Sequence, residues 1–265
     1  MIMSILMVHF CESFEYMNLN NWGVEIKVFL DIGAHFGETL DEVTKEKYSF
    51  DKIVCFEPSK HCRSKLEELA SKDHRIEICL FGLSNKNREA KLFLPGSLSA
   101  SIIMEDGVQS TEVAEEAENI RLVDATEWFE NNTNKGDLLV VKTNCEGSEV
   151  DIIDSLIDND YLKNIYSLLV TFDIRNYKKL QHREVEIRQK LRAQKQKNFC
   201  FSDDAMVGIS HSKRIENWLT LFGIDSDVSN IETLRAKYKN QFLKYSSKSG
   251  LFYRWETRLK RSINY

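Results

Sequence analysis

The chain has 265 residues, 42% of them hydrophobic, which is enough to form the core of one large domain or of a domain with an extension. Only 2 prolines and 11 glycines occur, which excludes long low-complexity linkers. A formal net charge of −5 gives no support for nucleic acid as a main partner, and we expect none.

The chain begins with a short apolar run, Met1–Val8, that His9 and Glu12 soon interrupt. No basic residue precedes this run, as one would in a signal peptide, and the run is too short to span a membrane. No later segment is long and apolar enough to do so. We therefore interpret residues 1–25 as a cap segment and expect no stable membrane insertion.

A strand followed by a glycine-bearing turn comes next, at residues 28–37 (VFLDIGAHFG). The apolar run predicts a strand that ends near Asp31, and Gly33 and Gly37 give the turn the freedom that close approach of a ligand requires. The following residues, 38–47, predict a helix over one face of the sheet.

This turn differs from the dinucleotide fingerprint G-x-G-x-x-G, because Ala34 and His35 stand where the second glycine would help. A strand-end carboxylate beside the start of a helix suits a ligand that has both a cation and a carboxylate. Its amine can meet Asp31 and its carboxylate can meet the helix N–H groups. The methionine part of S-adenosylmethionine has both groups.

The next strand, 53–56, also ends in an acid, Glu57, followed by Pro58. Glu57 lies 20 residues after Gly37 (57 − 37), which is about the spacing of an acid that accepts hydrogen bonds from the ribose of a nucleoside. A solvated strand-end acid is the alternative. A third strand, 76–81, leads into a loop where we expect an adenine ring, with Leu83 packed on its face and Gly82 and Ser84 at its edge.

Residues 59–71 predict a helix with Ser59 as its N-cap. The alternation of strands and helices up to this point is typical of a parallel doubly wound sheet. Residues 85–123 interrupt the alternation with an edge strand at 90–94, a serine-rich turn at 95–101 and an acidic stretch. We interpret this insertion as a candidate substrate lid, with an ordinary surface loop as the alternative.

A short strand at 120–123 follows, and Asp124 is placed to cap the helix 125–131. The fourth strand of the main sheet, 138–143, is apolar on both faces and therefore central. A helix begins after Gly147, and Glu149 in its first turn complements the helix dipole.

Acids at the tips of two strands are candidates for general acid–base chemistry on a second ligand, the acceptor. Glu146 follows the fourth strand, and Asp173 ends the fifth, 167–173. Parallel strands would bring both to one edge, where either could take a hydroxyl proton while Lys142 or Asn144 orients the acceptor. The alternative is that both acids only cap their own segments. His211 is a second candidate base, with a lone surface histidine as the alternative.

The remaining chain predicts a charged helix at 178–197, then two strands at 198–202 and 205–210 joined by a turn. Apolar residues in the tail, 225–265, fall on one helical face. We expect this tail to be a helical extension packed on the domain, with a helix for a partner or a membrane surface as the alternative.

Three of these segments resemble motifs of the FkbM family of S-adenosylmethionine-dependent methyltransferases. The turn Asp31–Gly37 resembles the family's D-x-G-A-N-x-G, Phe56–Pro58 matches its F-E-P, and Lys142–Glu149 resembles its K-I-D-V-E-G-A-E. His35 stands in place of the family's usual asparagine, and Asn144 stands in place of its usual aspartate. The resemblance extends over about residues 26–210.

The resemblance implies a class I methyltransferase fold over residues 26–224. This is an α/β, Rossmann-like, doubly wound and mostly parallel seven-stranded sheet with a C-terminal antiparallel hairpin. It also implies O-methylation of a hydroxyl on a sugar, a glycan or a small metabolite. The cofactor residues would be Asp31, Gly33, Ala34, His35, Gly37, Glu57, Pro58, Gly82, Leu83 and Ser84, and the catalytic residues Glu146, Asp173, Lys142 and Asn144.

Other functions stay open alongside this one. A nucleoside-binding module without catalysis is the main alternative, and a nicotinamide-dependent oxidoreductase is disfavoured by the missing fingerprint. We expect no metal site, because no cluster of histidines or cysteines supports one, and a homo-oligomer stays open beside a monomer. Six irregularly spaced cysteines without a C-x-x-C pair suggest reduced core thiols and a cytoplasmic location.

Overall fold

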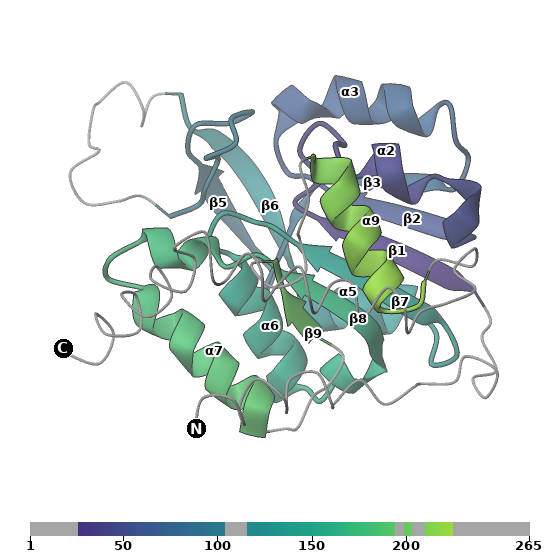
Figure 1. The fold of residues 1–265 in the computed structure, drawn as a ribbon. Coiled ribbons are helices and arrows are strands. Elements are labelled where there is room, and N and C mark those ends of the chain that lie inside the picture. The colour runs from purple at the N-terminus through teal and green to yellow at the C-terminus, as the bar shows by residue number, and fades with distance from the viewer. Residues whose placement is uncertain (1–25, 104–115, 194–198, 203–209, 225–265) are drawn as a thin grey trace, which may run out of the picture.

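A parallel sheet forms the centre of the computed structural model, which describes residues 26–103, 116–193, 199–202 and 210–224 (Figure 1). Within these residues the sheet has six strands in the order β3-β2-β1-β7-β8-β9, and every pairing is parallel. The strands are β1 (Lys27–Ile32), β2 (Lys52–Phe56), β3 (Ile76–Cys79), β7 (Leu138–Thr143), β8 (Ile165–Val170) and β9 (Phe199–Phe201). The predicted α/β class and parallel sheet are confirmed.

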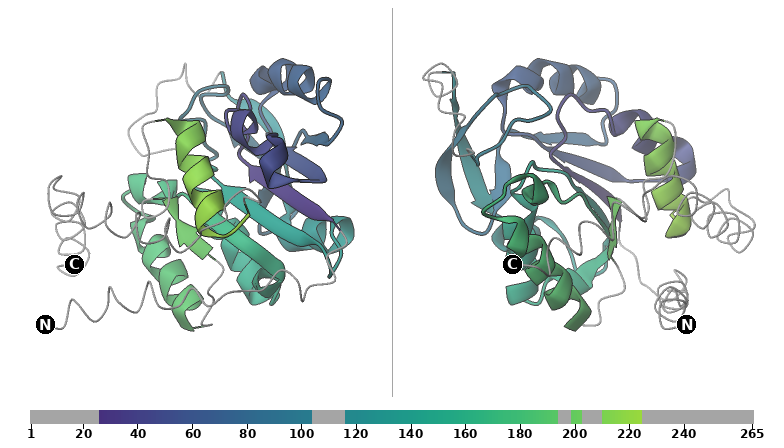
Figure 2. Two further views of the ribbon diagram at one scale, coloured as in Figure 1. Left: turned by 45° about the vertical axis from the view of Figure 1, so that its right-hand side comes forward. Right: turned by 60° about the vertical axis from the view of Figure 1, so that its left-hand side comes forward.

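Helices cover both faces of this sheet (Figures 1 and 2). One face carries α2 (Leu40–Val43), α3 (Lys60–Ala70) and α9 (His211–Leu221), and the other carries α5 (Ala125–Asn132), α6 (Glu149–Asp158) and α7 (Gln181–Ala193). Successive residues of β1 point to opposite faces of the sheet and so belong to different cores. Phe29 packs with Trp218 of α9, while Val28 and Leu30 belong to the core under α5 and α6. All six residues of β7 are buried, as the apolar run predicts.

A second, smaller sheet lies beside the first and contains β4 (Gly82–Ser84), β5 (Arg88–Leu92) and β6 (Glu118–Asp124). Its order is β4-β6-β5, with β4 parallel and β5 antiparallel to β6. The prediction of a loop at 82–84 is therefore wrong. This segment pairs with β6, about 40 residues later, and the local sequence does not reveal that pairing. The predicted edge strand belongs to this sheet.

Several element boundaries also differ from the predictions. The helix predicted at 38–47 is one turn, α2, followed by the 3₁₀ turn η2 (Glu46–Tyr48). A second 3₁₀ turn, η3 (Leu162–Asn164), leads into β8, and Asp173 opens a third, η4 (Asp173–Asn176), rather than ending β8. The predicted caps are confirmed, since the side chains of Ser59 and Asp124 accept hydrogen bonds from the first turns of α3 and α5.

The predicted C-terminal hairpin and seventh strand are not confirmed. β9 pairs in parallel with β8, and residues 203–209 lie outside the described residues. Ser210 caps α9 by accepting from the amide of Lys213, so it starts a helix where a strand end was expected. The cap segment at 1–25 and the extension at 225–265 also lie outside the described residues.

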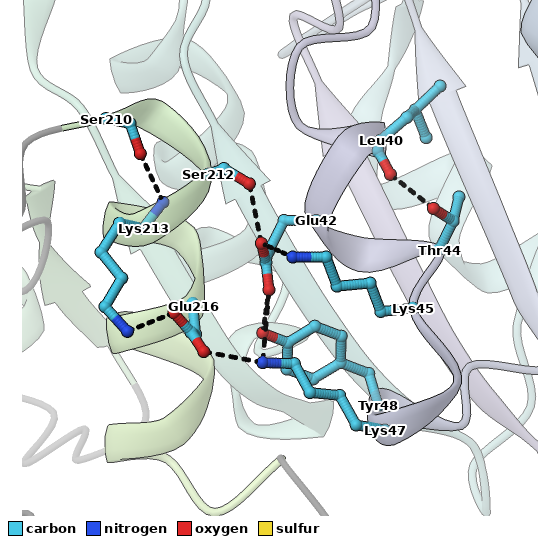
Figure 3. Close-up of polar contacts among 10 residues, drawn as sticks. All are labelled: Leu40, Glu42, Thr44, Lys45, Lys47, Tyr48, Ser210, Ser212, Lys213 and Glu216. Atoms are coloured by element: carbon cyan, nitrogen blue, oxygen red, sulfur yellow. Dashed lines mark hydrogen bonds and ion pairs between the residues drawn. The ribbon is translucent and has the colours of Figure 1, made fainter.

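A buried acid, Glu42, joins α9 to the first helix (Figure 3). Its carboxylate accepts hydrogen bonds from Tyr48 Oη (2.6 Å), Lys45 Nζ (2.5 Å) and Ser212 Oγ (2.7 Å). Burial alone would raise the pKa of Glu42, but these hydrogen bonds outweigh it and lower the pKa to about 2. The ion pair between Lys47 of η2 and Glu216 (2.8 Å) adds a second link to α9.

Candidate functional site

The strand order reverses between β1 and β7, which defines a topological switch point at the carboxyl edge of the sheet. Ligands of open α/β sheets bind in the crevice at such a point. The turns that follow β1 and β7 touch there, since a Cβ atom on Gly33 would lie 1.9 Å from the carbonyl oxygen of Asn144. Gly33 also has φ +85°, so both its space and its conformation require glycine.

A cavity of about 200 Å³ opens at this edge. Its lining brings together residues from all four predicted segments: Gly33, His35, Glu57, Pro58, Gly82, Leu83, Asn144 and Glu146. The second sheet adds an apolar wall of Leu92, Ile120 and Leu122, and the loop between β5 and β6 adds Gly96, Ser97, Leu98, Ala100 and Ile102. The insertion predicted as a lid therefore forms part of the site.

A wider, open hollow of about 470 Å³ lies at the same loop, lined by His61, Leu94, Pro95, Ser97 and Glu116. We assign the functional site to the inner cavity, because that is where the turns at the switch point converge.

Six of the predicted site residues do not line the cavity: Asp31, Ala34, Gly37, Ser84, Lys142 and Asp173. Ala34 and Ser84 are buried, and Gly37 packs against the side chain of Leu69 in α3. These three pack around the cavity, and the three charged residues lie behind its lining.

Asp31 and Lys142 form a buried ion pair beneath the cavity. Their side chains are 0% and 5% exposed, and Lys142 Nζ lies 2.6 Å from Asp31 Oδ1. The ammonium also donates to the carbonyl of Gly33 at 3.3 Å. Lys142 therefore holds the first turn in place, in contrast to the expectation that it orients the acceptor.

Two buried acceptor atoms near this pair have no hydrogen-bond partner among the described residues, Asp31 Oδ2 and Asn144 Oδ1. Buried acceptors without partners are rare and suggest a donor that the protein itself does not supply. A ligand ammonium has three N–H donors and would suit them.

The amides of the first turn are engaged within the protein. The amides of Gly33 and Ala34 donate to the carbonyl of Phe56 (3.0 and 3.1 Å), and the amide of Gly37 donates to Ala34. Helix α2 is a single turn. These three amides therefore do not face a ligand carboxylate, because the turn closes onto the end of β2, and the expected contact with the N–H groups at the start of the helix stays a prediction.

Glu57 lies at the rim of the cavity and is 8% exposed. Its two oxygens accept from the amides of Ser59 and His35, each at 2.9 Å. Burial raises the pKa of Glu57, and these two hydrogen bonds oppose that rise. An ionised carboxylate has about four acceptor positions. The two amides occupy two of them, so Glu57 retains about two for the hydroxyls of a ligand.

His35 connects the first turn to the loop between β5 and β6. Its Nδ1 lies 2.8 Å from Glu38 Oε1, and its Nε2 lies 3.3 Å from the carbonyl oxygen of Gly96. Its backbone has φ +50°, which few residues other than glycine adopt. The comparison of His35 with the family's asparagine does not predict this link to the loop.

Glu146 also lines the cavity and has φ +50°. Burial raises the pKa of Glu146 to about 7, and the negative charges of Asp173 and Glu149 add to the effect. A carboxyl group with such a pKa can gain or lose a proton near neutral pH, which suits general acid–base catalysis. A left-handed conformation outside glycine costs about 1–3 kcal/mol and tends to occur at functional sites.

Glu149 does more than complement a helix dipole, which was its predicted role. It is fully buried, and its oxygens accept from the amides of Ile174 (2.8 Å) and Gly147 (2.7 Å). Burial raises the pKa of Glu149 to about 7. Glu149 therefore links the segment that follows β7 to η4, which follows β8.

His211 starts α9 and is partly buried, so it is not a lone surface histidine. Its Nε2 lies 3.2 Å from Thr39 Oγ1. Burial lowers the pKa of His211, and the nearby charge of Lys142 adds to this. His211 does not line the cavity.

Within the described ranges, no group of three or more histidine, cysteine or acidic side chains could hold a metal ion. No helix in the same ranges is long and apolar enough to cross a membrane. The cysteines that the structure describes are free, four of them buried and Cys145 partly so.

The fold and the cavity define this chain as an α/β protein with a cavity at the switch point of its sheet. No protein-family model matches the sequence, and no curated protein does. Among solved structures, the chain is similar to the methyltransferase FkbM from Methylobacillus flagellatus, with a TM-score of 0.33 and 14% identity. The match covers 55% of this chain and spans only 33% of that one, and a likeness of this size establishes no shared function.

Proposed function

We propose that this chain is an S-adenosylmethionine-dependent methyltransferase of the FkbM kind, acting on a hydroxyl of a sugar, a glycan or a small metabolite. The observation that carries the proposal is the meeting of four separate sequence segments in one cavity at the switch point. Three of these segments carry the motifs that resemble the family, and the fourth, Gly82–Ser84, is where we expect the adenine ring.

The residues around the cavity fit such a cofactor. Glu57 has acceptor positions for ribose hydroxyls, and Leu83 with the apolar wall of the second sheet suits an adenine ring. The partnerless oxygens of Asp31 and Asn144 suit its ammonium. When bound, the cofactor supplies an electrophilic methyl group on a sulfonium.

The cavity is smaller than the range of about 300–1,000 Å³ that is common for ligand pockets. Side chains of the loop between β5 and β6, including Leu98 and Ile102, occupy part of its wall. We propose that residues 93–103 of this loop open to admit the cofactor and close over it, as a lid does.

On the acceptor side, we assign Glu146 as the group that takes the hydroxyl proton and Asn144 as the group that orients the acceptor. Asp173 acts through its charge, which helps to raise the pKa of Glu146. Lys142 acts by holding Asp31 and the first turn. We further propose a cytoplasmic location and a small-molecule or glycan acceptor, with no role for nucleic acid.

A binding module that holds a nucleoside without catalysis is the second candidate. It is favoured by Asn144, which replaces the aspartate of the family motif and has no ionisable proton. This candidate predicts cofactor binding without turnover.

Two stages of one experiment separate these functions. Thermal shifts of the full chain with S-adenosylhomocysteine, S-adenosylmethionine and NAD come first, and transfer of labelled methyl to a panel of sugars and small alcohols follows. The proposal predicts stabilisation by the two sulfur compounds only, weakened in Glu57→Gln, and then label transfer. Stabilisation by NAD alone, or by none of the three in a folded protein, would contradict it, and binding without transfer to any acceptor would support the binding module.

A further inference from the structure

The peptide unit between Glu146 and Gly147 is held at both ends by side chains from three separate segments. Its carbonyl oxygen accepts from Ser101 Oγ at 2.7 Å and from Tyr177 Oη at 3.2 Å. Its N–H donates to Glu149 Oε2 at 2.7 Å. Few peptide units outside regular structure have this many side-chain partners, since most backbone hydrogen bonds are made to other backbone groups.

The backbone on either side of this peptide has a conformation that needs such support. Glu146 has φ +50° and Gly147 has φ +104°. A side chain on Gly147 would meet Ile103 Cδ1 at 2.7 Å and the ring of Tyr177 at 3.0 Å. Sparsely populated conformations persist only where the surrounding structure determines them, and here the surroundings are the segments that carry the two hydroxyls.

Ser101 belongs to the loop that moves in the proposed function. Within that loop its backbone pairs with Phe93 (2.9 and 3.2 Å), and its hydroxyl also accepts from the amide of Ile103 at 3.0 Å. Gly96 of the same loop contacts His35 in the first turn. The loop thus touches the cofactor-side turn at one point and the acceptor-side turn at another.

We propose that Ser101 and Tyr177 are positioning residues for Glu146: their hydroxyls fix the peptide that follows it and so aim its carboxyl group at the cavity. Because Ser101 lies on the loop, the full set of hydrogen bonds forms only when the loop is closed. This inference rests on the proposed function, in which Glu146 takes the proton, and it makes that role conditional on closure.

The test uses Ser101→Ala, Tyr177→Phe and the double variant, each compared with a matched control. Ser99→Ala removes an exposed hydroxyl from the same loop, and Tyr166→Phe removes a hydroxyl that donates to Phe222, outside the cavity. Ser101→Thr keeps the hydroxyl and serves as the rescue variant. Two measurements are made on the ligand-free protein: amide exchange at Gly147, and titration of the Glu146 carboxyl by carbon NMR, assigned with Glu146→Gln.

We expect the double variant to exchange the Gly147 amide about tenfold faster or more, in line with the loss of two hydrogen bonds. We expect the titration midpoint of Glu146 to move by about one pH unit toward that of an exposed glutamate. Each single variant should show part of both effects, so the single variants alone decide the test if the double variant does not fold. The controls and Ser101→Thr should match the wild type.

Unchanged exchange and an unchanged midpoint in the folded variants would overturn the inference, and so would equal effects in the controls. Binding of S-adenosylhomocysteine is measured separately by calorimetry. If the wild type does not bind it, the proposed function fails while the two ligand-free measurements still decide the role of the hydroxyls.

Discussion

Replacing Lys142 by methionine tests the structure beneath the cavity. The substitution keeps most of the length of the side chain but removes the ammonium that lies 2.6 Å from Asp31 Oδ1. Asp31 has no exposed surface, and its second oxygen has no partner among the described residues. The variant therefore leaves a buried carboxylate with no opposite charge beside it.

The structure gives the size of the effect. At 2.6 Å and an effective dielectric constant of about 20, the attraction between the two charges is about 6 kcal/mol before desolvation is subtracted. Desolvation offsets much of this, yet breaking one side of a buried pair costs about 3–5 kcal/mol because the remaining charge is uncompensated. Removing both charges, in Asp31→Asn with Lys142→Met, should cost less than Lys142→Met alone.

Urea unfolding at neutral pH measures these values. Lys163→Met is the matched control, because Lys163 pairs with Asp160 at an exposed position where ion pairs contribute about 0–1 kcal/mol. We expect Lys142→Met to lose about 3–5 kcal/mol and the double variant to recover part of the loss. A loss as small as that of the control, or a double variant less stable than Lys142→Met, would refute the reasoning.

Three further predictions concern acids. Glu42→Gln should lower the free energy of unfolding by about 1–2 kcal/mol at pH 7, less than the full pKa shift implies because Lys45 is half exposed. The folded pKa of Glu42 is depressed, so urea unfolding should show the difference above about pH 4.5, shrinking as the pH falls toward 2. Glu57→Gln should weaken S-adenosylhomocysteine binding by about 1.5–3 kcal/mol in calorimetry, and unchanged affinity would exclude the ribose role. Glu146→Gln should keep that affinity but lower turnover by about 10²–10⁴-fold, and wild-type turnover should rise with pH through about 7. Full turnover in the folded variant would leave alignment alone as the mechanism.

The parallel sheet and its central strands were predictable from the sequence because their signal is local. A strand buried on both faces reads as a continuous apolar run, as β7 does, and caps such as Ser59 and Asp124 lie next to the helices they start. Because the strands are parallel, the residues at their carboxyl ends lie at the same edge of the sheet. The sequence therefore predicts that Gly33, Glu57 and Asn144 lie near one another, and all three line the cavity.

The parts that could not be predicted depend on contacts between distant segments. Residues 82–84 are a strand only because β6 pairs with them. Lys142 is paired with Asp31 across 111 residues, and Glu149 reaches an amide 25 residues later. Ser101 lies in the serine-rich turn, and nothing near it in the sequence indicates its hydrogen bond to the carbonyl of Glu146.

We propose that the cavity at the switch point binds the nucleoside and the amino acid parts of one cofactor. Calorimetric titration of the full chain with S-adenosylhomocysteine tests it most directly, with NAD titrated in parallel under the same conditions. We predict saturable binding of one S-adenosylhomocysteine per chain and no heat from NAD beyond dilution. A folded chain that takes up NAD, or that gives no binding heat with S-adenosylhomocysteine at any temperature tried, would contradict the account.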